Sequence, residues 1–271
     1  MKVHAIQTGR IVGNRNALRA TGWSALFRRW ENFEFPAYVY IIEHPEGHIA
    51  IDTGMNAKGW SRPVMYRLFF PYPIINGEHE EIGPQMESRG LNPEDVRTVI
   101  ITHLDVDHVG GVHWFPNAEI LVHRPEYELT SRYMWRKWFQ TDLWHPEFNP
   151  SLYDMDTETY GPFPQSKIFR KNIEIRVVPI PGHTPGQIGV IVQTNGVLIF
   201  FVGDHILRQD WLVEDWKAGN LYGIGALIEP KKAAKTTRRI QQFADKEPTV
   251  LIPAHDSQAP ERLEKMETVR F

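Results

Sequence analysis

The chain has 271 residues, of which 42% are hydrophobic and 23% are charged, a balance typical of a globular protein with a sizeable core. The formal net charge of −3 gives no reason to expect a polyanionic partner. Cysteine is absent, which excludes disulfides and thiolate ligands, so any bound metal must rely on imidazole and carboxylate groups. With no long apolar run and no signal-like start, we expect one cytoplasmic domain over residues 1–271.

The first part of the chain predicts short strands joined by turns. Val3–Thr8 is expected to form a strand, and Tyr38–Glu43 and His48–Asp52 a hairpin across the turn His44–Gly47. Asp52 ends that hairpin. It is expected either to support a site from behind through hydrogen bonds or to serve the turn alone.

Irregular segments with many aromatic or apolar residues interrupt these strands. Gly9–Glu34 could form a lid, a subunit contact or ordinary core packing. Arg67–Ile75 is apolar and broken by prolines, and we interpret it as a loop over the site or at an interface. Pro84–Arg89 is expected to be a short helix that Gly90 closes.

The next stretch is the most informative one in the chain. Val99–Thr102 is β-branched throughout and predicts a buried strand. Four potential metal ligands follow within six positions, namely His103, Asp105, Asp107 and His108. Carboxylates crowded at the edge of a core repel one another and lose hydration, so they need a cation. Gly110 and Gly111 follow where the backbone must turn or pack closely.

Three later apolar strands each lead into a residue of ligand type, namely His183, Asp204 and His255. Strand ends that converge on one point are how α/β sheets build sites. With the first stretch they offer enough histidines and aspartates for two metal ions that share a carboxylate. His113 and His123 are expected to cap or pack rather than to bind metal.

The remaining elements are expected to frame this site. Arg124–Phe148 predicts an aromatic helix that packs on the core or partly walls an apolar substrate. Asn149–Ser166 is expected to be a loop. Further elements are expected as two strands in Lys167–Ile180, a hairpin of Gln187–Gln193 and Val197–Val202, an amphipathic helix at Lys231–Phe243, a strand at Thr249–Ile252 and a helix in residues 257–271.

With these motifs in the order given, residues 38–256 resemble the metallo-β-lactamase superfamily of metal-dependent hydrolases. His103–His108 matches its His-x-His-x-Asp-His motif, and Ile51–Gly54 resembles the turn that precedes the motif. Within the superfamily the chain looks most like N-acyl-homoserine lactonases and related lactonases. The resemblance implies an α+β fold, an αββα sandwich of two mixed β-sheets flanked by helices, and one such domain over residues 1–271.

The resemblance also implies a division of the ligands between two divalent metal ions. One ion would take His103, Asp105 and His183, the other Asp107, His108 and His255, with Asp204 bridging both. A metal-bridging hydroxide would then be the nucleophile. Asp107 would act as the catalytic residue that orients it and passes a proton to the leaving oxygen.

Two positions depart from the family pattern. Asp105 replaces the second histidine of the motif. Zinc is the first expectation for the metal, but this carboxylate should favour iron, manganese or cobalt more than a histidine would. Alternatively, Asp105 turns away and water completes the shell. Leu207 stands where many of these lactonases carry a tyrosine that contacts the substrate carbonyl, a contact that Tyr222 or His205 could supply.

Several functions are compatible with this ligand set. The first is a dinuclear hydrolase that opens a lactone, such as an N-acyl-homoserine lactone, or cleaves an ester. The alternative is a phosphodiesterase or phosphotriesterase on the same metals. An iron redox enzyme would need a second cofactor domain, and a non-catalytic structural site would seldom be dinuclear. We expect a small-molecule substrate, no nucleic acid, no membrane partner, and a homodimer as an allowed assembly.

Overall fold

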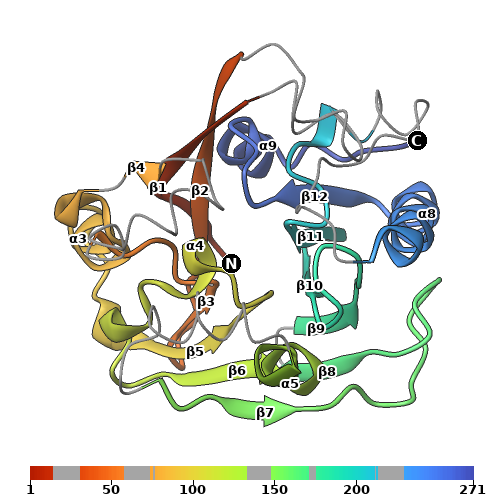
Figure 1. Ribbon diagram of the computed structural model, residues 1–271, viewed down its shortest axis with the longest axis horizontal. Helices are drawn as coiled ribbons and strands as arrows, with labels where there is room; N and C mark the ends of the chain where they lie inside the picture. Colours follow the sequence, from red (N-terminus) through yellow and green to blue (C-terminus); the bar gives the residue numbers. More distant parts are fainter. Residues whose placement is uncertain are drawn as a thin grey trace. The chain divides into compact units, whose positions relative to one another are not determined.

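The computed structural model of the protein describes residues 1–14, 31–57, 74–75, 77–132, 148–170, 175–210, 212 and 229–271. Within these residues the chain forms two compact units, one containing the described residues up to Tyr153 and the other those from Asp154 onward. Each unit is built around one β-sheet (Figure 1). No helix in the described part of the chain is long and apolar enough to cross a membrane.

The first unit contains a mixed seven-stranded sheet in the order β4-β1-β2-β3-β5-β6-β7. Its strands are β1 (Val3–Asn14), β2 (Asn32–Ile42), β3 (His48–Ile51), β4 (Ile74–Ile75), β5 (Val96–Ile100), β6 (Glu119–His123) and β7 (Ser151–Tyr153). The strands from β3 through β5 and β6 to β7 run parallel, so their C-terminal ends share one edge. The metal-ligand stretch leaves β5 at that edge.

Three predictions in this unit were wrong in their bounds. The first strand continues past Thr8 to Asn14 because a bulge, with Gly9 at φ +128°, shifts the register without ending the pairing with β2. β2 accordingly begins at Asn32 rather than at Tyr38. The predicted loop Asn149–Ser166 contains the edge strand β7, which is too short to show an alternating pattern.

Short helices connect these strands. They are η3 (Glu78–Glu80), α3 (Ile82–Glu87), η4 (Pro93–Asp95), α4 (Val106–Val109), η5 (Val112–Trp114) and α5 (Arg124–Arg132). Ile82 and Met86 of α3 are fully buried in one core with Ile6 and Ile41 of the sheet. The predicted helix before Gly90 is therefore confirmed, and Gly90 has the expected positive φ of +74°.

The second unit contains a five-stranded sheet in the order β12-β11-β10-β9-β8. Its elements are β8 (Lys167–Arg170), β9 (Ile175–Pro179), β10 (Ile188–Thr194), β11 (Val197–Gly203), α8 (Pro230–Lys246), β12 (Thr249–Pro253) and α9 (Ala259–Lys265). β11 and β12 are parallel, and the other neighbours are antiparallel. The predicted hairpin is confirmed, since Asn195 and Gly196 both have positive φ between β10 and β11.

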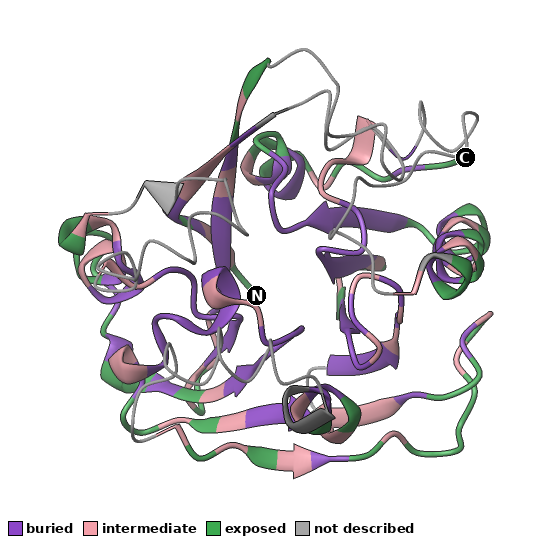
Figure 2. Cartoon of the chain, viewed as in Figure 1, coloured by how far each residue is buried: buried purple, intermediate pink, exposed green. Residues whose placement is uncertain are grey.

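Aromatic packing fixes α8 on this sheet. The rings of Phe163, Phe200 and Phe243 lie within 5.8 Å of one another, centroid to centroid, and all three side chains are buried. The opposite face of α8 carries exposed lysines, as the amphipathic pattern predicts (Figure 2). The terminal helix is shorter than predicted, because α9 ends at Lys265 with Met266 in the left-handed region.

Some predicted segments fall outside the described residues. They comprise residues 15–30 of the Gly9–Glu34 segment, residues 67–73 of the apolar loop, residues 133–147 of the aromatic helix, and Tyr222. Of that helix the described part is α5, Arg124–Arg132.

Candidate metal centre

The first unit places four predicted ligands in the stretch from the end of β5 through the first turn of α4. His103, Asp107 and His108 are buried, and the side chain of Asp105 is 27% exposed. The rings of His103 and His108 are 4.0 Å apart, centroid to centroid. Because α4 begins at Val106, Asp107 and His108 lie on its first turn and return toward the strand end that carries His103.

Asp52 orients both histidines, His108 by a direct hydrogen bond and His103 through Thr102. Its Oδ1 accepts a hydrogen bond of 2.7 Å from the Thr102 backbone N–H, and its Oδ2 accepts one of 2.8 Å from the Thr102 hydroxyl. Oδ2 also lies 2.8 Å from Nδ1 of His108. Since a carboxylate only accepts, this Nδ1 carries the hydrogen and Nε2 carries the lone pair, which is the form that binds metal.

The Thr102 hydroxyl sets the same tautomer in His103. Its oxygen lies 3.1 Å from Nδ1 of His103. Because this hydroxyl already donates to Asp52, it accepts from His103, and the lone pair of that imidazole is again on Nε2. The supporting role proposed for Asp52 is thereby found, together with the turn role, since Asp52 itself has φ +60°.

Asp105 occupies the N-cap of α4, yet its side chain makes no capping hydrogen bond. An aspartate there would ordinarily bond the N–H groups of the first turn and stabilise the helix by about 1 kcal/mol. Its Oδ2 instead lies 3.6 Å from Nε2 of His103.

The turn is pressed against the segment that follows β3. Thr53 donates to the His108 carbonyl through its backbone N–H, at 2.7 Å, and through its hydroxyl, at 3.0 Å. A Cβ on Gly110 would meet the backbone nitrogen of Asn56 at 2.6 Å, which confirms the close packing expected at this glycine. The backbone around His108 is therefore fixed by the hydrogen bonds from Thr53 and by the close packing of Gly110 on Asn56.

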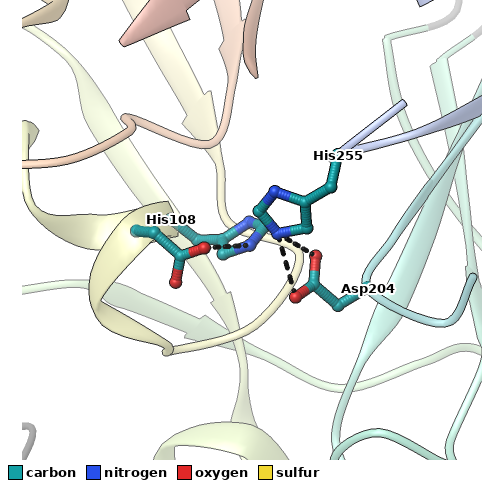
Figure 3. A group of neighbouring side chains, drawn as sticks. His108, Asp204 and His255 are labelled. Carbon is teal, nitrogen blue, oxygen red and sulfur yellow. Dashed lines mark hydrogen bonds and ion pairs between the residues drawn. The ribbon is translucent and has the colours of Figure 1, made fainter. Parts of the chain in front are cut away.

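The second unit places its three predicted ligands just after strands, and Figure 3 shows two of them, Asp204 and His255. Asp204 follows β11, His255 follows the parallel neighbour β12, and His183 lies in the turn after β9. Nε2 of His255 is 3.1 Å from Oδ1 and 3.2 Å from Oδ2 of Asp204. Nε2 of His183 lies 3.9 Å from Oδ2 of the same carboxylate.

The chemistry of these donors fits divalent metal ions. Buried imidazoles that present Nε2 and buried carboxylates are the ligands that zinc and its neighbours take in cysteine-free sites. In the first unit Asp107 Oδ2 lies 3.6 Å from Nε2 of His108, and in the second unit Asp204 Oδ1 lies 3.1 Å from Nε2 of His255. Each unit therefore places a carboxylate oxygen opposite an imidazole nitrogen, as around a shared cation. His103, Asp107, His108, Asp204 and His255 are all at most 8% exposed.

The other histidines considered from the sequence have structural partners. Nε2 of His113 lies 3.2 Å from the buried Glu81, and His123 is buried beside the ring of Tyr153. His205 is buried with Nε2 3.0 Å from the Thr237 hydroxyl, and burial lowers its pKa to about 3, with the nearby His183 adding to the effect. It is therefore neutral at ordinary pH. Leu207 is partly exposed.

The sequence interpretation missed several supporting residues. The sequence shows Thr102 only as the last residue of a β-branched run, although its hydroxyl joins Asp52 to His103. The buried carboxylate of Glu126 accepts a hydrogen bond of 3.1 Å from Leu104 N–H, between two predicted ligands. The Arg262–Asp256 ion pair was also missed. A carboxylate at the start of a helix is ordinary capping chemistry, so nothing in the sequence distinguished either acid.

The chain belongs to the Metallo-beta-lactamase superfamily, whose family pattern matches residues 32–255. An N-acyl homoserine lactonase of Bacillus cereus is 22% identical over 260 residues, which cover 94% of this chain and 93% of that protein. The N-acyl homoserine lactonase AttM of Rhizobium radiobacter is 25% identical over 239 residues, 84% of each chain.

Solved structures agree on the fold. A quorum-quenching N-acyl homoserine lactone lactonase superposes with a TM-score of 0.72 at 20% identity, covering 95% of this chain and 92% of that one. AidC, described as a dizinc quorum-quenching lactonase, gives a TM-score of 0.65 at 16% identity, covering 95% and 88%. The predicted α+β metallo-β-lactamase fold and the hydrolase class are confirmed.

Proposed function

We propose that this protein is a dinuclear metal-dependent hydrolase that opens the ring of N-acyl-homoserine lactones or of closely related lactones and esters. The relatives that cover most of the chain carry the name N-acyl homoserine lactonase, which supports this substrate class. The proposal treats the two compact units as halves of one catalytic domain, because the family match runs across both.

The observation that carries the proposal is the hydrogen-bond chain from Asp52. One carboxylate orders His108 directly and His103 through the Thr102 hydroxyl, so both imidazoles offer Nε2. A histidine that only fills a core needs no such control of its tautomer. Metal-binding histidines, by contrast, characteristically donate their other ring N–H to a carboxylate or another acceptor.

In the proposed assignment His103, Asp105 and His183 hold one ion, while Asp107, His108 and His255 hold the other. Asp204 bridges them, which its position against His255 and His183 in the second unit supports. We include Asp105 as a ligand because it makes no capping hydrogen bond and lies near His103 Nε2. Zinc is the first choice, and this added carboxylate would make iron, manganese or cobalt more competitive.

The ions would supply the Lewis acidity that polarises the substrate carbonyl and makes a water molecule acidic enough to attack near neutral pH. The chain's own part is then the movement of a proton. The carboxylate of Asp107 would accept the proton of the attacking water and pass it to the ring oxygen that leaves as an alcohol. Lactone opening consumes one water and yields one hydroxy acid, so no further co-reactant is needed.

The proposal further holds that the protein works on a small molecule in the cytoplasm, with a homodimer as an allowed assembly. In the proposed orientation the carbonyl of the lactone lies at the metal end and the acyl chain extends along an apolar wall. A chain in contact with apolar side chains gains up to about 0.8 kcal/mol for each buried methylene.

The test is a series of acyl-homoserine lactones of increasing chain length, assayed beside matched phosphodiesters and simple esters. We expect lactone opening with kcat/KM rising along the series, and loss of activity in Asp107→Asn. Faster turnover of the phosphodiesters would favour the alternative hydrolase on the same metals. Lactone opening that survives in Asp107→Asn would overturn the assignment of the proton-transfer residue.

A further inference from the structure

A buried carboxylate next to His255 joins the two strand-end loops of the second unit. Asp256 is 1% exposed. Its Oδ2 accepts a hydrogen bond of 3.0 Å from the backbone N–H of Gln209, five residues beyond Asp204. Its Oδ1 accepts one of 3.0 Å from Gln258 N–H, at the start of α9. One side chain therefore fixes the loop after β11 to the loop after β12.

Arg262 of α9 completes this connection. Its guanidinium donates to Oδ2 of Asp256 at 3.0 Å, and only 4% of the residue is exposed. A second guanidinium nitrogen donates to the side chain of Gln258 at 3.3 Å. Moving two charges out of water is costly, and their mutual attraction offsets this cost only when the geometry is good. A buried ion pair of this kind is therefore weak evidence that it serves only to stabilise the fold. Its location in the fold needs another explanation.

The position of the pair coincides with the predicted ligands. Asp204 and His255 approach within 3.1 Å, and they come from the two loops that Asp256 holds. The relative placement of these loops decides whether a carboxylate and an imidazole can share one ion. A shift of a few tenths of an ångström at a metal ligand lies outside the tolerance of such sites.

We propose that Asp256 and Arg262 are positioning residues that hold Asp204 and His255 at the separation the metal site requires. The inference rests on the proposed function, because it assumes that these two side chains bind metal. Neither Asp256 nor Arg262 is assigned any contact with metal or substrate. Their effect would act through the loops, so metal affinity should fall even in variants that remain folded.

The experiment compares Arg262→Lys and Asp256→Asn with the unaltered protein. Both variants keep side-chain volume, and the lysine keeps the charge while losing the planar fork that spans Asp256 and Gln258. We expect the apparent zinc affinity, measured by competition with a chromophoric chelator, to fall by about 10–100-fold, the range seen when groups behind metal ligands are altered. In the cobalt-loaded protein the visible absorption bands should shift or weaken.

Arg176→Lys is the matched control. Arg176 is another buried arginine of the second unit, bonded to Ser166 at 2.8 Å and stacked over Tyr160, and it contacts neither ligand loop in any of these interactions. Its replacement should lower the urea midpoint of the metal-free protein without changing zinc affinity. The Arg262 and Asp256 variants should show both effects.

The outcomes separate the two levels of the proposal. If the unaltered protein binds two ions and the Arg262 and Asp256 variants bind them with unchanged affinity and spectra, the positioning role is wrong and the proposed function stands. If all three variants lose affinity in proportion to stability, the pair is merely structural and the inference also fails. If the unaltered protein binds no divalent metal, the proposed function itself fails.

Discussion

Asp52 Oδ2 lies 2.8 Å from Nδ1 of His108, and both side chains are buried. The two residues are separated by more than 50 positions in sequence: Asp52 directly follows β3, and His108 lies in α4, the helix that comes after the parallel neighbour β5. This contact makes the imidazole an Nδ1–H donor and directs its lone pair to Nε2. A residue directly after β3 thus sets the tautomer of a histidine in the predicted metal motif.

Replacing Asp52 by Asn should weaken metal binding. The amide can present N–H where the carboxylate accepted, so His108 would accept at Nδ1 and carry its hydrogen on Nε2. We expect metal affinity to fall by about 10–100-fold in a chelator-competition titration. Thr102→Val should perturb only the link to His103 and give a smaller loss. Equal affinity in Asp52→Asn and the unaltered protein would contradict the tautomer argument.

Much of this arrangement could be predicted from the sequence. The ligand types stand directly after apolar strands, and the parallel pairing of β11 with β12 brings Asp204 and His255 to one sheet edge, as such strand ends predict. The hydrogen-bonding partners could not be found in this way. Thr102 is a β-branched residue of the kind common in strands. Glu126 and Asp256 are acidic residues near the starts of helices, where such residues are common for capping alone.

The longer strands were missed for a different physical reason. The bulge between Gln7 and Arg10 interrupts the alternating pattern, and Gly9 suggests an end where the chain only changes register. After the bulge, the residues from Arg10 to Asn14 pair again with β2, whose residues lie far away in the sequence. Local periodicity carries no information about that pairing.

Asp105 is expected to select among metals. Asp105→Ala should lower metal occupancy, and Asp105→His should restore it with a greater preference for zinc, because imidazole replaces a hard oxygen donor. Elemental analysis after loading with equal concentrations of zinc and manganese would measure both effects. If occupancy and preference are the same in both variants as in the unaltered protein, Asp105 is not a ligand.

Gly110→Ala should destabilise the first unit. Gly110 has φ −61° and ψ −31°, which alanine adopts readily, so the cost is steric. The new methyl would press on the backbone of Asn56 and Gly54, and such overpacking costs about 1–3 kcal/mol. Urea unfolding would measure it, and metal affinity should fall with it because His108 lies two residues away.

Gly90→Ala serves as the comparison for this glycine. Gly90 has φ +74° and no heavy atom within 4 Å of the position that a Cβ would take, so alanine there costs about 1–2 kcal/mol for the left-handed backbone and should leave metal affinity unchanged. The two variants thus match in substitution and differ in location. A Gly110→Ala protein with full stability and full metal affinity would show that the close approach to Asn56 is dispensable.

The most direct measurement for the central claim is a metal titration of chelator-stripped protein, in which bound metal and acyl-homoserine lactone opening are followed in the same samples. The proton released when the lactone becomes a hydroxy acid reports the reaction. We expect negligible activity without metal, a rise with added ion, and saturation at two ions per chain. Full lactone opening by the metal-free protein, or saturation of both binding and activity at one ion, would contradict the account.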